Sequence, residues 1–366
     1  MGRKLLAEPD LAKKLAANAA QDVRPCIYCY ACVSQIFINK GIKCAVNARV
    51  GHESESTIQF APKPKHVLIV GGGPSGMEAA RVAALRGHRV TLVERSDRLG
   101  GTLFFAALAY PENGRLLDYL VKQMAHPNIT VRLNTSVDAA LINALQPDEI
   151  MVGTGAKRAA PAIDGADQNH VWSGDELRRL MTGDRADEIA KAKLSLTERA
   201  LFKAGGMLGV TDSTQAIQGL SKLWMPLGRR VVVIGGGLVG LELAEFLLDR
   251  GREVTVLEPG THPGTELAIV RRWRVVEAVK AHGKLQLLAQ VQNITRKEVI
   301  WTDKSGAVQS TPADSVVIAL GAQPDASVAE AIARMTSVPV QQLGDSHELG
   351  YIEGAMHSGH RAGATV

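Results

Sequence analysis

Apolar and polar positions repeat one pattern at two places along the chain. Residues 67–70 and 231–234 are short, mostly β-branched apolar runs, the pattern of strands buried inside a parallel sheet. Each run passes through glycines into a stretch typical of a helix, over 77–86 and 241–250, and a glycine directly follows each stretch. A second apolar run comes next in both places. The pattern therefore predicts strand, tight turn, helix and strand, twice.

The two regions are copies of one unit. Residues 67–76 (VLIVGGGPSG) align with residues 231–240 (VVVIGGGLVG) at a displacement of 164 positions, and the same displacement carries 87–94 onto 251–258. Strand, turn, helix and strand form the βαβ unit of a dinucleotide-binding sheet. We therefore expect an α/β fold with two Rossmann-like dinucleotide-binding domains.

Each copy carries the glycine spacing G-x-G-x-x-G between its first strand and its helix. The first glycine permits a tight turn, the second lets the backbone approach a pyrophosphate, and the third lets the helix pack close to the sheet. Free N–H groups and the helix dipole then favour a phosphate at the helix N-terminus. These glycines are Gly71, Gly73 and Gly76 in the first copy and Gly235, Gly237 and Gly240 in the second.

An acidic residue ends the second strand of each copy. Glu94 and Glu258 each lie 18 residues after the last glycine of their loop, where a carboxylate can bind ribose hydroxyls. No basic residue directly follows Glu258, which favours NADH over NADPH because a carboxylate repels the 2′-phosphate. Arg271, Arg272 and Arg274 weaken this preference, although they could equally form a solvated helix face.

Composition sets the broad class of the protein. The 366 residues suffice for two or three domains, and fractions of 46% hydrophobic and 22% charged residues are those of a globular protein. No stretch approaches the ~18 consecutive apolar residues of a membrane span, and the charged start is not a signal peptide, so we expect a cytoplasmic protein. A net charge of +5 spread along the chain and 4% aromatic residues argue against nucleic acid as a partner.

All four cysteines fall in one short segment. Cys26, Cys29, Cys32 and Cys44 form a C-x2-C-x2-C-x11-C array, whose spacing favours a metal centre over disulfides. Zinc bound by four cysteines prefers two separated pairs, whereas a C-x2-C-x2-C run with a remote fourth thiolate is typical of a 4Fe-4S cluster. Zinc and unligated cysteines remain the alternatives to this metal-site prediction.

The surroundings of the two glycine loops resemble a flavoprotein with two dinucleotide-binding domains, of the FAD/NAD(P)-binding disulfide-reductase type. The stretches after Glu94 and from 338 to 355 carry this resemblance. It implies that the first copy binds FAD and the second binds a nicotinamide nucleotide. The second domain would then be inserted between two parts of the FAD-binding domain. Asp345 would then bind the ribityl chain, with an ordinary helix cap as the alternative, and the helix starting near Tyr351 would face the flavin pyrimidine.

The resemblance implies two sets of nucleotide-binding residues. Gly155 and Gly321 each follow a strand, at a position where the chain could cross a nucleotide or simply turn. The FAD set is Gly71, Gly73, Pro74, Ser75, Gly76, Glu94, Arg95, Gly101, Thr102, Gly155, Asp345 and Ile352. The NAD set is Gly235, Gly237, Leu238, Val239, Gly240, Glu258 and Gly321.

The chain as a whole is similar to the part of the bacterial 2,4-dienoyl-CoA reductase and trimethylamine dehydrogenase family that follows the flavin-bearing barrel. Residues 1–11, 24–29, 44–49 and 224–228 carry the likeness. In the reductases of that family, electrons pass from a nicotinamide through FAD and a 4Fe-4S cluster to FMN in an old-yellow-enzyme-like barrel. In the amine dehydrogenases they flow outward to an electron-transfer flavoprotein, and the first nucleotide site can hold ADP.

Two details leave the direction of electron flow open. The spacing between Cys29 and Cys32 and the presence of Ala48 where the reductases usually have proline both resemble the amine-dehydrogenase branch. The barrel itself is missing from the sequence. Gly2-Arg3 resembles the dipeptide whose arginine holds the FMN phosphate, but we expect a lone arginine here to be solvated. We likewise expect His357 and His360 at a helix surface.

The predicted function is that of a flavin- and iron-sulfur-dependent oxidoreductase. It would pass electrons from NADH through FAD and a 4Fe-4S cluster to an FMN-bearing barrel that reduces enoyl or dienoyl substrates. Alternatives are an electron-output module of an amine-dehydrogenase-like enzyme, with ADP or FAD in the first site, and a non-catalytic remnant. Stacked rings exchange hydride without a general acid or base, so no catalytic side chain is predicted.

The expected organisation has four parts and at least one partner. The partner would be an FMN-binding barrel subunit or an electron-transfer flavoprotein, and the chain could form a homo-oligomer. The parts are a barrel-end remnant and cluster segment (1–62), an FAD-binding domain (63–160 and 312–366), a connecting helical segment (161–228) and an NAD(P)H-binding domain (229–311).

Overall fold

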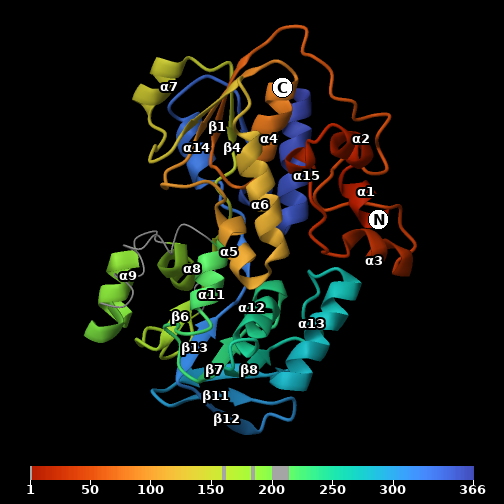
Figure 1. The fold of residues 1–366 in the computed structure, drawn as a ribbon. Helices are drawn as coiled ribbons and strands as arrows, with labels where there is room; N and C mark the ends of the chain where they lie inside the picture. Colours follow the sequence, from red (N-terminus) through yellow and green to blue (C-terminus); the bar gives the residue numbers. More distant parts are fainter. Residues whose placement is uncertain (1, 159–161, 183–185, 200–213) are drawn as a thin grey trace. The chain divides into compact units, whose positions relative to one another are not determined.

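The computed structural model describes residues 2–158, 162–182, 186–199 and 214–366. The chain divides into two compact units, each a sheet with helices packed on it (Figure 1). The first unit comprises Met1–Ala106, Glu112–Lys157 and Ala322–Val366, and the second comprises Ala107–Pro111 and Arg158–Gly321.

The first unit is built on a five-stranded parallel sheet in the order β15-β4-β1-β2-β3. In the central strand, Val67 lies opposite Val90 on one side and Glu149 on the other. Every residue of β1 is buried, because helices cover both faces of the sheet. The strands are β1 (His66–Val70), β2 (Arg89–Val93), β3 (Ile129–Arg132), β4 (Glu149–Val152) and β15 (Val340–Gln342).

Glycines let two helices of the first unit pack closely. Helix α4 (Pro74–Leu85) follows β1, and α15 (Tyr351–Thr365) lies beside it (Figure 1). A Cβ atom at Gly359 would lie 2.3 Å from the carbonyl oxygen of Ser75, so only glycine permits this approach. The remaining helices are α6 (Glu112–Gln123), α7 (Ala139–Leu145), α14 (Ser327–Ala333) and the short 3-10 turn η3 (Gly344–Ser346), while α5 (Thr102–Ala109) contains a unit boundary.

The N-terminal segment is mostly short helices and belongs to the first unit. It contains α1 (Gly2–Ala7), α2 (Leu11–Ala16), the 3-10 turn η1 (Ala20–Asp22) and α3 (Ala31–Phe37). The buried side chain of Asn47 holds two earlier parts of this segment together. Its amide nitrogen donates to the Leu6 carbonyl oxygen (2.9 Å), and its amide oxygen accepts from Arg24 (3.1 Å). An ion pair of 2.5 Å between Lys43 and Glu353 joins the segment to α15.

The second unit repeats the architecture of the first. Its five-stranded parallel sheet has the order β6-β13-β7-β8-β9, and a three-stranded antiparallel sheet, β10-β11-β12, belongs to the same unit. The strands are β6 (Val171–Ser173), β7 (Arg230–Ile234), β8 (Glu253–Glu258), β9 (Lys284–Leu287), β10 (Gln290–Ile294), β11 (Glu298–Thr302), β12 (Val308–Pro312) and β13 (Ser315–Ile318). The helices are α8 (Gly174–Thr182), α9 (Ala186–Lys193), α11 (Thr214–Leu220), α12 (Leu238–Leu248) and α13 (Ile269–His282).

The unit boundaries differ from the domain limits expected from the sequence. Strand β13 pairs with β7, so the second unit continues to Gly321 and does not end at residue 311. The stretch 161–228 is more than a helical connection, because β6 within it pairs with β13 at the edge of the second sheet. Strands β5 (Lys157–Arg158) and β14 (Ala322–Gln323) pair where the chain crosses between the units.

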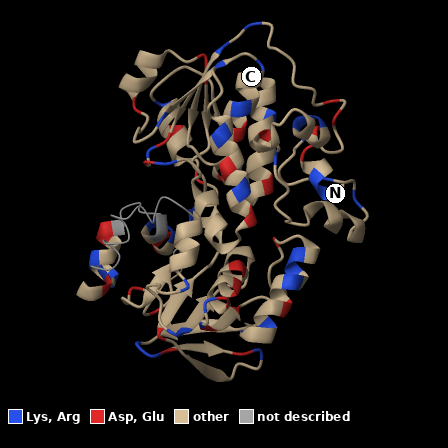
Figure 2. Ribbon diagram, viewed as in Figure 1, with Lys and Arg blue, Asp and Glu red and all other residues tan. Residues whose placement is uncertain are grey.

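The two predicted βαβ copies are present as β1-α4-β2 and β7-α12-β8, so the predicted α/β fold is confirmed. Helix α4 starts at Pro74, three residues before the predicted start of the helix, because proline suits the first turn. In the described part of the chain, no helix has the length and apolar character needed to cross a bilayer. Figure 2 shows basic and acidic residues interspersed along the helices in this view.

Candidate functional site

The first glycine loop joins β1 to α4 and has a backbone that only glycine can adopt. Gly71 has φ +106°, and a Cβ atom there would lie 2.5 Å from the carbonyl oxygen of Gly153 at the end of β4. A Cβ atom at Gly76 would lie 2.0 Å from the Gly71 carbonyl oxygen. The turn is therefore as tight as the sequence predicts, with Gly73 preceding the first residue of α4.

The second loop, between β7 and α12, repeats this geometry. Gly235 also has φ +106°, and its Cβ atom would lie 2.7 Å from the carbonyl oxygen of Ala319, which follows β13. At Gly240 a Cβ atom would lie 1.9 Å from the Gly235 carbonyl oxygen. Both loops thus place the N-terminus of a helix at the carboxyl edge of a parallel sheet, where such folds bind nucleotides.

The two acidic residues hold the backbone of their glycine loops. The amide of Gly72 donates to Glu94 Oε2 at 2.7 Å, and the amide of Gly236 donates to Glu258 Oε2 at 2.6 Å. The other carboxylate oxygen, Oε1, accepts from a backbone amide two residues later, that of Ser96 (2.9 Å) or Gly260 (2.6 Å). The carboxylates therefore order the loops and still have lone pairs for a ribose hydroxyl. Sequence reasoning predicted only the ribose contact.

Other predicted first-site residues surround the first loop. Ser75 is buried, and Cβ atoms at Gly153 and Gly344 would lie 2.7 and 2.9 Å from its hydroxyl oxygen. Gly101 is close to the loop, since its Cβ atom would be 3.3 Å from the Cα of Gly73. Three further residues from the predicted FAD set, Arg95, Thr102 and Gly155, are exposed or half-buried.

Asp345 marks the start of α15. Its Oδ1 atom accepts hydrogen bonds from the amides of Gly350 (2.9 Å) and Tyr351 (3.0 Å). Tyr351 has φ +54°, so the carboxylate stabilises an unusual backbone where the helix begins. The Asp345 carboxylate thus accepts from the first amides of α15, although Gly350 and not Asp345 is the residue directly before the helix. Ile352, in the first turn, is half-buried.

An acidic side chain lies at the N-terminus of α12 in the second unit. The amide of Leu238 donates to Glu266 Oε2 at 3.2 Å, and a Cβ atom at Gly237 would lie 3.0 Å from Glu266 Oε1. The exposed carboxylate therefore occupies the place where a helix N-terminus would meet a phosphate. Sequence reasoning missed Glu266, because its distance along the chain from the loop gives no signal.

One arginine near the second loop is committed to an ion-pair network. Arg271 is buried and forms ion pairs with Glu245 (2.5 Å) and Glu242 (3.4 Å) on α12. Desolvation raises the pKa of Glu242. Arg271 is therefore neither a solvated residue nor a free ligand for a 2′-phosphate, while Arg272 is half-buried and Arg274 exposed.

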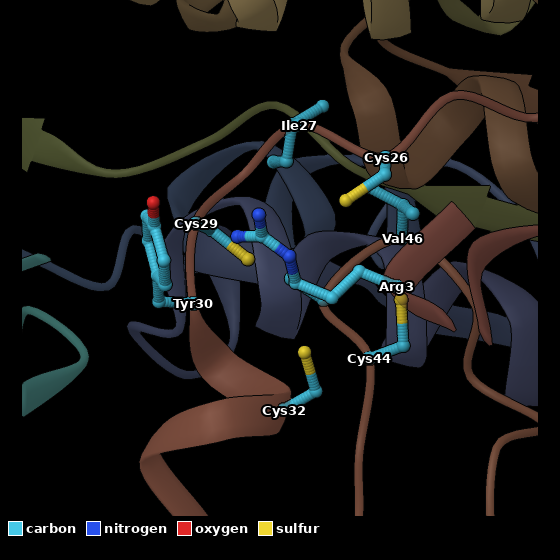
Figure 3. Close-up of a pocket in the computed structure, with 9 residues that line it drawn as sticks. Arg3, Cys26, Ile27, Cys29, Tyr30, Cys32, Cys44 and Val46 are labelled. Carbon is cyan, nitrogen blue, oxygen red and sulfur yellow. The ribbon is translucent and has the colours of Figure 1, made fainter. Parts of the chain in front are cut away.

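The four cysteines line one pocket in the first unit, together with residues of α1 and the loop before α3 (Figure 3). Two residues in that loop, Tyr28 and Tyr30, have φ of +52° and +63°, a left-handed winding that turns successive cysteines toward the same space. All four are free thiols. The array therefore converges as its spacing predicts.

Burial shapes the chemistry of these thiols. Desolvation raises the pKa of Cys29 to about 12 and also raises the pKa of Cys44. Such thiols become thiolate ligands only when bound cations supply compensating charge. Among the described residues, no three His, Cys, Asp or Glu side chains form a group that could hold a single metal ion. A cluster differs from a single ion, because each of its irons takes its own thiolate and the sulfurs lie further apart.

His360 of α15 is buried inside the first unit, contrary to the expected surface position, whereas His357 is half-buried. His357 Nε2 lies 2.8 Å from the carbonyl oxygen of Cys44. His360 is 3% exposed, and its Nδ1 lies 3.5 Å from Glu78 Oε1. Glycine and alanine neighbours bring α15 so close to α4 that side chains between the helices are covered.

Glu78 is the centre of a buried ion-pair network that the sequence did not predict. Its carboxylate accepts two hydrogen bonds from Arg81, at 2.7 and 2.8 Å, and lies 3.7 Å from Arg24. Although burial opposes ionisation, the two guanidinium groups and the contact with His360 hold the pKa of Glu78 well below its usual range. The network joins the cysteine segment, α4 and α15.

Comparisons with known proteins agree with this arrangement. The family model described as pyridine nucleotide-disulphide oxidoreductase matches residues 39–143 and 130–338. Bilirubin reductase of Mediterraneibacter gnavus is 34% identical over 95% of the chain and 48% of its own length. NADH oxidase of Thermoanaerobacter brockii is 30% identical over 98% of the chain and 50% of its own length.

A solved structure extends the comparison. A 2-naphthoyl-CoA reductase in complex with 2-naphthoyl-CoA superposes with a TM-score of 0.82 and 29% identity, covering 100% of this chain and 50% of that one. The chain thus spans about half the length of these relatives, and the family implies flavin and pyridine nucleotide binding. The chain belongs to the pyridine nucleotide-disulphide oxidoreductase family, in which it corresponds to the reductase part of the 2,4-dienoyl-CoA reductase and trimethylamine dehydrogenase enzymes.

Proposed function

We propose that this protein is an NADH-dependent flavoprotein oxidoreductase that delivers electrons through FAD and a 4Fe-4S cluster to an FMN-bearing barrel. The observation that carries the proposal is the path of α15. The helix begins at the Asp345 carboxylate of the first nucleotide site and contacts the Cys44 loop through His357. Tyr351 and His357 are six residues apart, about 9 Å along a helix, so the two sites are close within one compact unit.

The first site is proposed to hold FAD. Its glycine loop and the N-terminus of α4 bind the pyrophosphate, Glu94 binds the ribose, and Asp345 orients the ribityl chain. The dipole of α15 places positive charge at the flavin pyrimidine. The complete set is Gly71, Gly73, Pro74, Ser75, Gly76, Glu94, Arg95, Gly101, Thr102, Gly155, Asp345 and Ile352.

The second site is proposed to hold NADH. Glu258 favours an unphosphorylated ribose, and Arg271, which is paired with Glu242 and Glu245, does not offer a free cation to a 2′-phosphate. The related protein named NADH oxidase supports the same nucleotide. The binding set is Gly235, Gly237, Leu238, Val239, Gly240, Glu258 and Gly321.

The cysteine pocket is proposed to hold the cluster, with Cys26, Cys29, Cys32 and Cys44 as its ligands. Bound flavin can accept a hydride and release single electrons, which makes a one-electron relay useful beside it. The protein's own contribution is to position these groups, because its backbone brings four cysteine side chains to one pocket in which Cys44 is buried. No side chain needs to act as acid or base in hydride transfer between stacked rings.

The electron acceptor is proposed to be a barrel that reduces enoyl- or dienoyl-type substrates, in the same longer protein or in a partner subunit. The relatives are about twice as long as the chain, and one of them is named 2-naphthoyl-CoA reductase. Exposed apolar side chains on and after α3, namely Ile36 (77% exposed), Phe37 (53%) and Ile42 (48%), support a docking surface beside the cysteine pocket.

Anaerobic titration with NADH tests the proposal. The purified, flavin-loaded protein should lose its flavin absorbance on addition of NADH, and chemical analysis should find iron and sulfide in equal amounts, near four of each per chain. A flavin that NADH does not bleach would contradict the proposed electron input. Stoichiometric zinc without iron would contradict the proposed cluster.

The position of Glu266 favours one alternative, an electron-output module like that of the amine dehydrogenases. A carboxylate at the N-terminus of α12 opposes pyrophosphate binding, as expected where the second nucleotide site is unused. The first site would then hold ADP or FAD, and an electron-transfer flavoprotein would accept the electrons. The same titration separates the two functions, because the output module leaves its flavin oxidised in the presence of NADH.

A further inference from the structure

Each copy of the repeated unit has a return loop (95–102 and 259–266), which leads from its second strand back to its glycine loop. In both copies a glycine amide of the return loop donates to a carbonyl oxygen of the glycine loop at 2.8 Å, Gly100 to Gly72 and Gly264 to Gly236. The displacement of 164 positions therefore extends through the return loops. The two copies can be compared position by position.

The copies differ at two positions beside the start of the helix. Thr102 ends the return loop of the first copy, and Glu266 stands at the corresponding position of the second. The first helical residue is Pro74 in α4 and Leu238 in α12. Proline has no amide hydrogen, whereas the Leu238 amide donates to Glu266 Oε2 at 3.2 Å. The second copy thus has a carboxylate together with the amide that holds it.

The Glu266 carboxylate covers a glycine that the first copy leaves uncovered. A Cβ atom at Gly237 would lie 3.0 Å from Glu266 Oε1. At the corresponding Gly73, the nearest atom among the described residues, outside the adjoining chain, is the Gly153 carbonyl oxygen, at 4.0 Å. This second glycine of the motif is the one that lets the backbone approach a pyrophosphate. An anionic side chain therefore lies at the pyrophosphate position in the second copy, and not in the first.

We propose that Glu266 is a displaceable competitor of the nucleotide diphosphate, and that it makes the second site an exchange site. This inference rests on the proposed function, because it requires a nucleotide at each copy. A nicotinamide nucleotide is used up in each hydride transfer and must leave, whereas the flavin is reoxidised in place. An exposed charge at a helix terminus changes binding by only about two- to fivefold, so Glu266 speeds release without closing the site.

Release of NAD⁺ from the flavin-loaded full chain tests this role. Surface plasmon resonance, with NAD⁺ passed over the immobilised chain, gives the release rate and the dissociation constant. Glu266→Gln removes the charge at similar size, and Glu266→Thr installs the residue of the first copy. Both variants should lower the release rate and the dissociation constant by about two- to fivefold.

A matched control separates this effect from a general change of surface charge. Glu277→Gln removes a carboxylate at an exposed position of α13 in the same unit and should keep the wild-type values. Wild-type release from Glu266→Gln overturns the inference, as does an equal decrease in Glu277→Gln.

The reverse exchange tests the same role in the first copy. The double variant Pro74→Leu, Thr102→Glu places the amide and the carboxylate of the second copy at the first site, and Pro74→Leu alone is its control. In flavin-free buffer the double variant should release flavin about two- to fivefold faster than the control, measured by the fluorescence of free flavin. Equal release from the two variants overturns the inference. If both are purified without flavin, the Glu266 variants alone decide it.

Failure of the proposed function gives a different result. A wild-type chain that binds no NAD⁺ contradicts the proposed second site itself, and binding that appears only in Glu266→Thr supports the electron-output module instead. A wild-type chain that binds NAD⁺ and releases it as slowly as Glu266→Thr leaves the proposed function standing and removes only the role of Glu266.

Discussion

His357 Nε2 lies 2.8 Å from the carbonyl oxygen of Cys44, so a helix near the end of the chain contacts the backbone of a proposed cluster ligand. The two residues are 313 positions apart in the sequence. The Lys43–Glu353 ion pair one turn earlier on α15 strengthens the same connection. The cysteine loop and the first nucleotide site are therefore held by one rigid element.

Replacing His357 should slow electron transfer between the two sites. His357→Ala removes the hydrogen bond to Cys44, worth about 0.5–1.5 kcal/mol, and loosens the loop against α15. In stopped-flow experiments with NADH, flavin reduction should keep its rate, and subsequent cluster reduction should slow severalfold. His52→Ala is the control, because His52 is an exposed residue of the N-terminal segment. Equal cluster reduction rates in wild type and His357→Ala would contradict this prediction.

The third glycines of the two loops should have separable roles. Gly76→Ala forces a Cβ atom to 2.0 Å from the Gly71 carbonyl oxygen, and Gly240→Ala forces one to 1.9 Å from that of Gly235. Purified Gly76→Ala should lose most of its flavin absorbance. Gly240→Ala should retain flavin, but NADH should not bleach it. Each variant is the control for the other, and loss of flavin in both would argue against separate sites.

Removal of the Glu266 charge should strengthen NADH binding. Glu266→Gln eliminates a carboxylate at the N-terminus of α12, where it competes with a pyrophosphate for helix N–H groups. Charge–dipole effects of about 0.3–1 kcal/mol predict a two- to fivefold lower NADH concentration for half-maximal flavin bleaching. Glu277→Gln, at an exposed position of α13, should behave as wild type. A weaker response in Glu266→Gln would instead indicate that Glu266 contacts the nucleotide.

The buried Glu78 network should make the protein sensitive to acid. The pKa of Glu78 is lower in the folded state than its ordinary value of 4.5, so the unfolded state binds more protons as the pH falls. The free energy of unfolding should therefore decrease on acidification below about pH 5, and should be fully restored above it. Denaturant titrations monitored by circular dichroism at several pH values measure this slope.

Removing the charge of Glu78 should strongly lower the stability of the folded protein. Glu78→Gln leaves Arg81 and Arg24 buried without their counter-charge, which should cost about 3–5 kcal/mol at neutral pH. The variant should also lose most of the acid-dependent slope. Glu112→Gln, which removes only a surface pair with Arg115, should change stability by less than about 1 kcal/mol. If the two substitutions lowered the free energy of unfolding equally, the larger cost expected for the buried carboxylate would be contradicted.

Local pattern accounts for the parts of the fold that were predicted from sequence. A glycine loop between an apolar run and a helix is encoded within about 30 residues, and both copies formed as expected. The convergence of the cysteines could also be predicted from local sequence, because Cys26, Cys29 and Cys32 are only three residues apart along the chain.

Long-range contacts account for what was missed. The burial of His360 depends on α15 packing against α4, which the sequence around it does not reveal. Arg3 looks like any residue of a charged chain start until Tyr28 and Tyr30 are placed around it. Strand β6 has only three residues, too few for a periodic signal, and pairs with a strand more than 140 residues later.

The return of the chain to the first sheet sets an order of assembly during synthesis. The first glycine loop is made before the second unit, but β15 and α15, which complete its sheet and cover α4, are made only after the whole second unit. The second unit can therefore fold on the ribosome while the first still lacks an edge strand and a covering helix. During that interval the face of α4 that α15 later covers has no partner, so we expect the first unit to be the part that is exposed to chaperones and proteases.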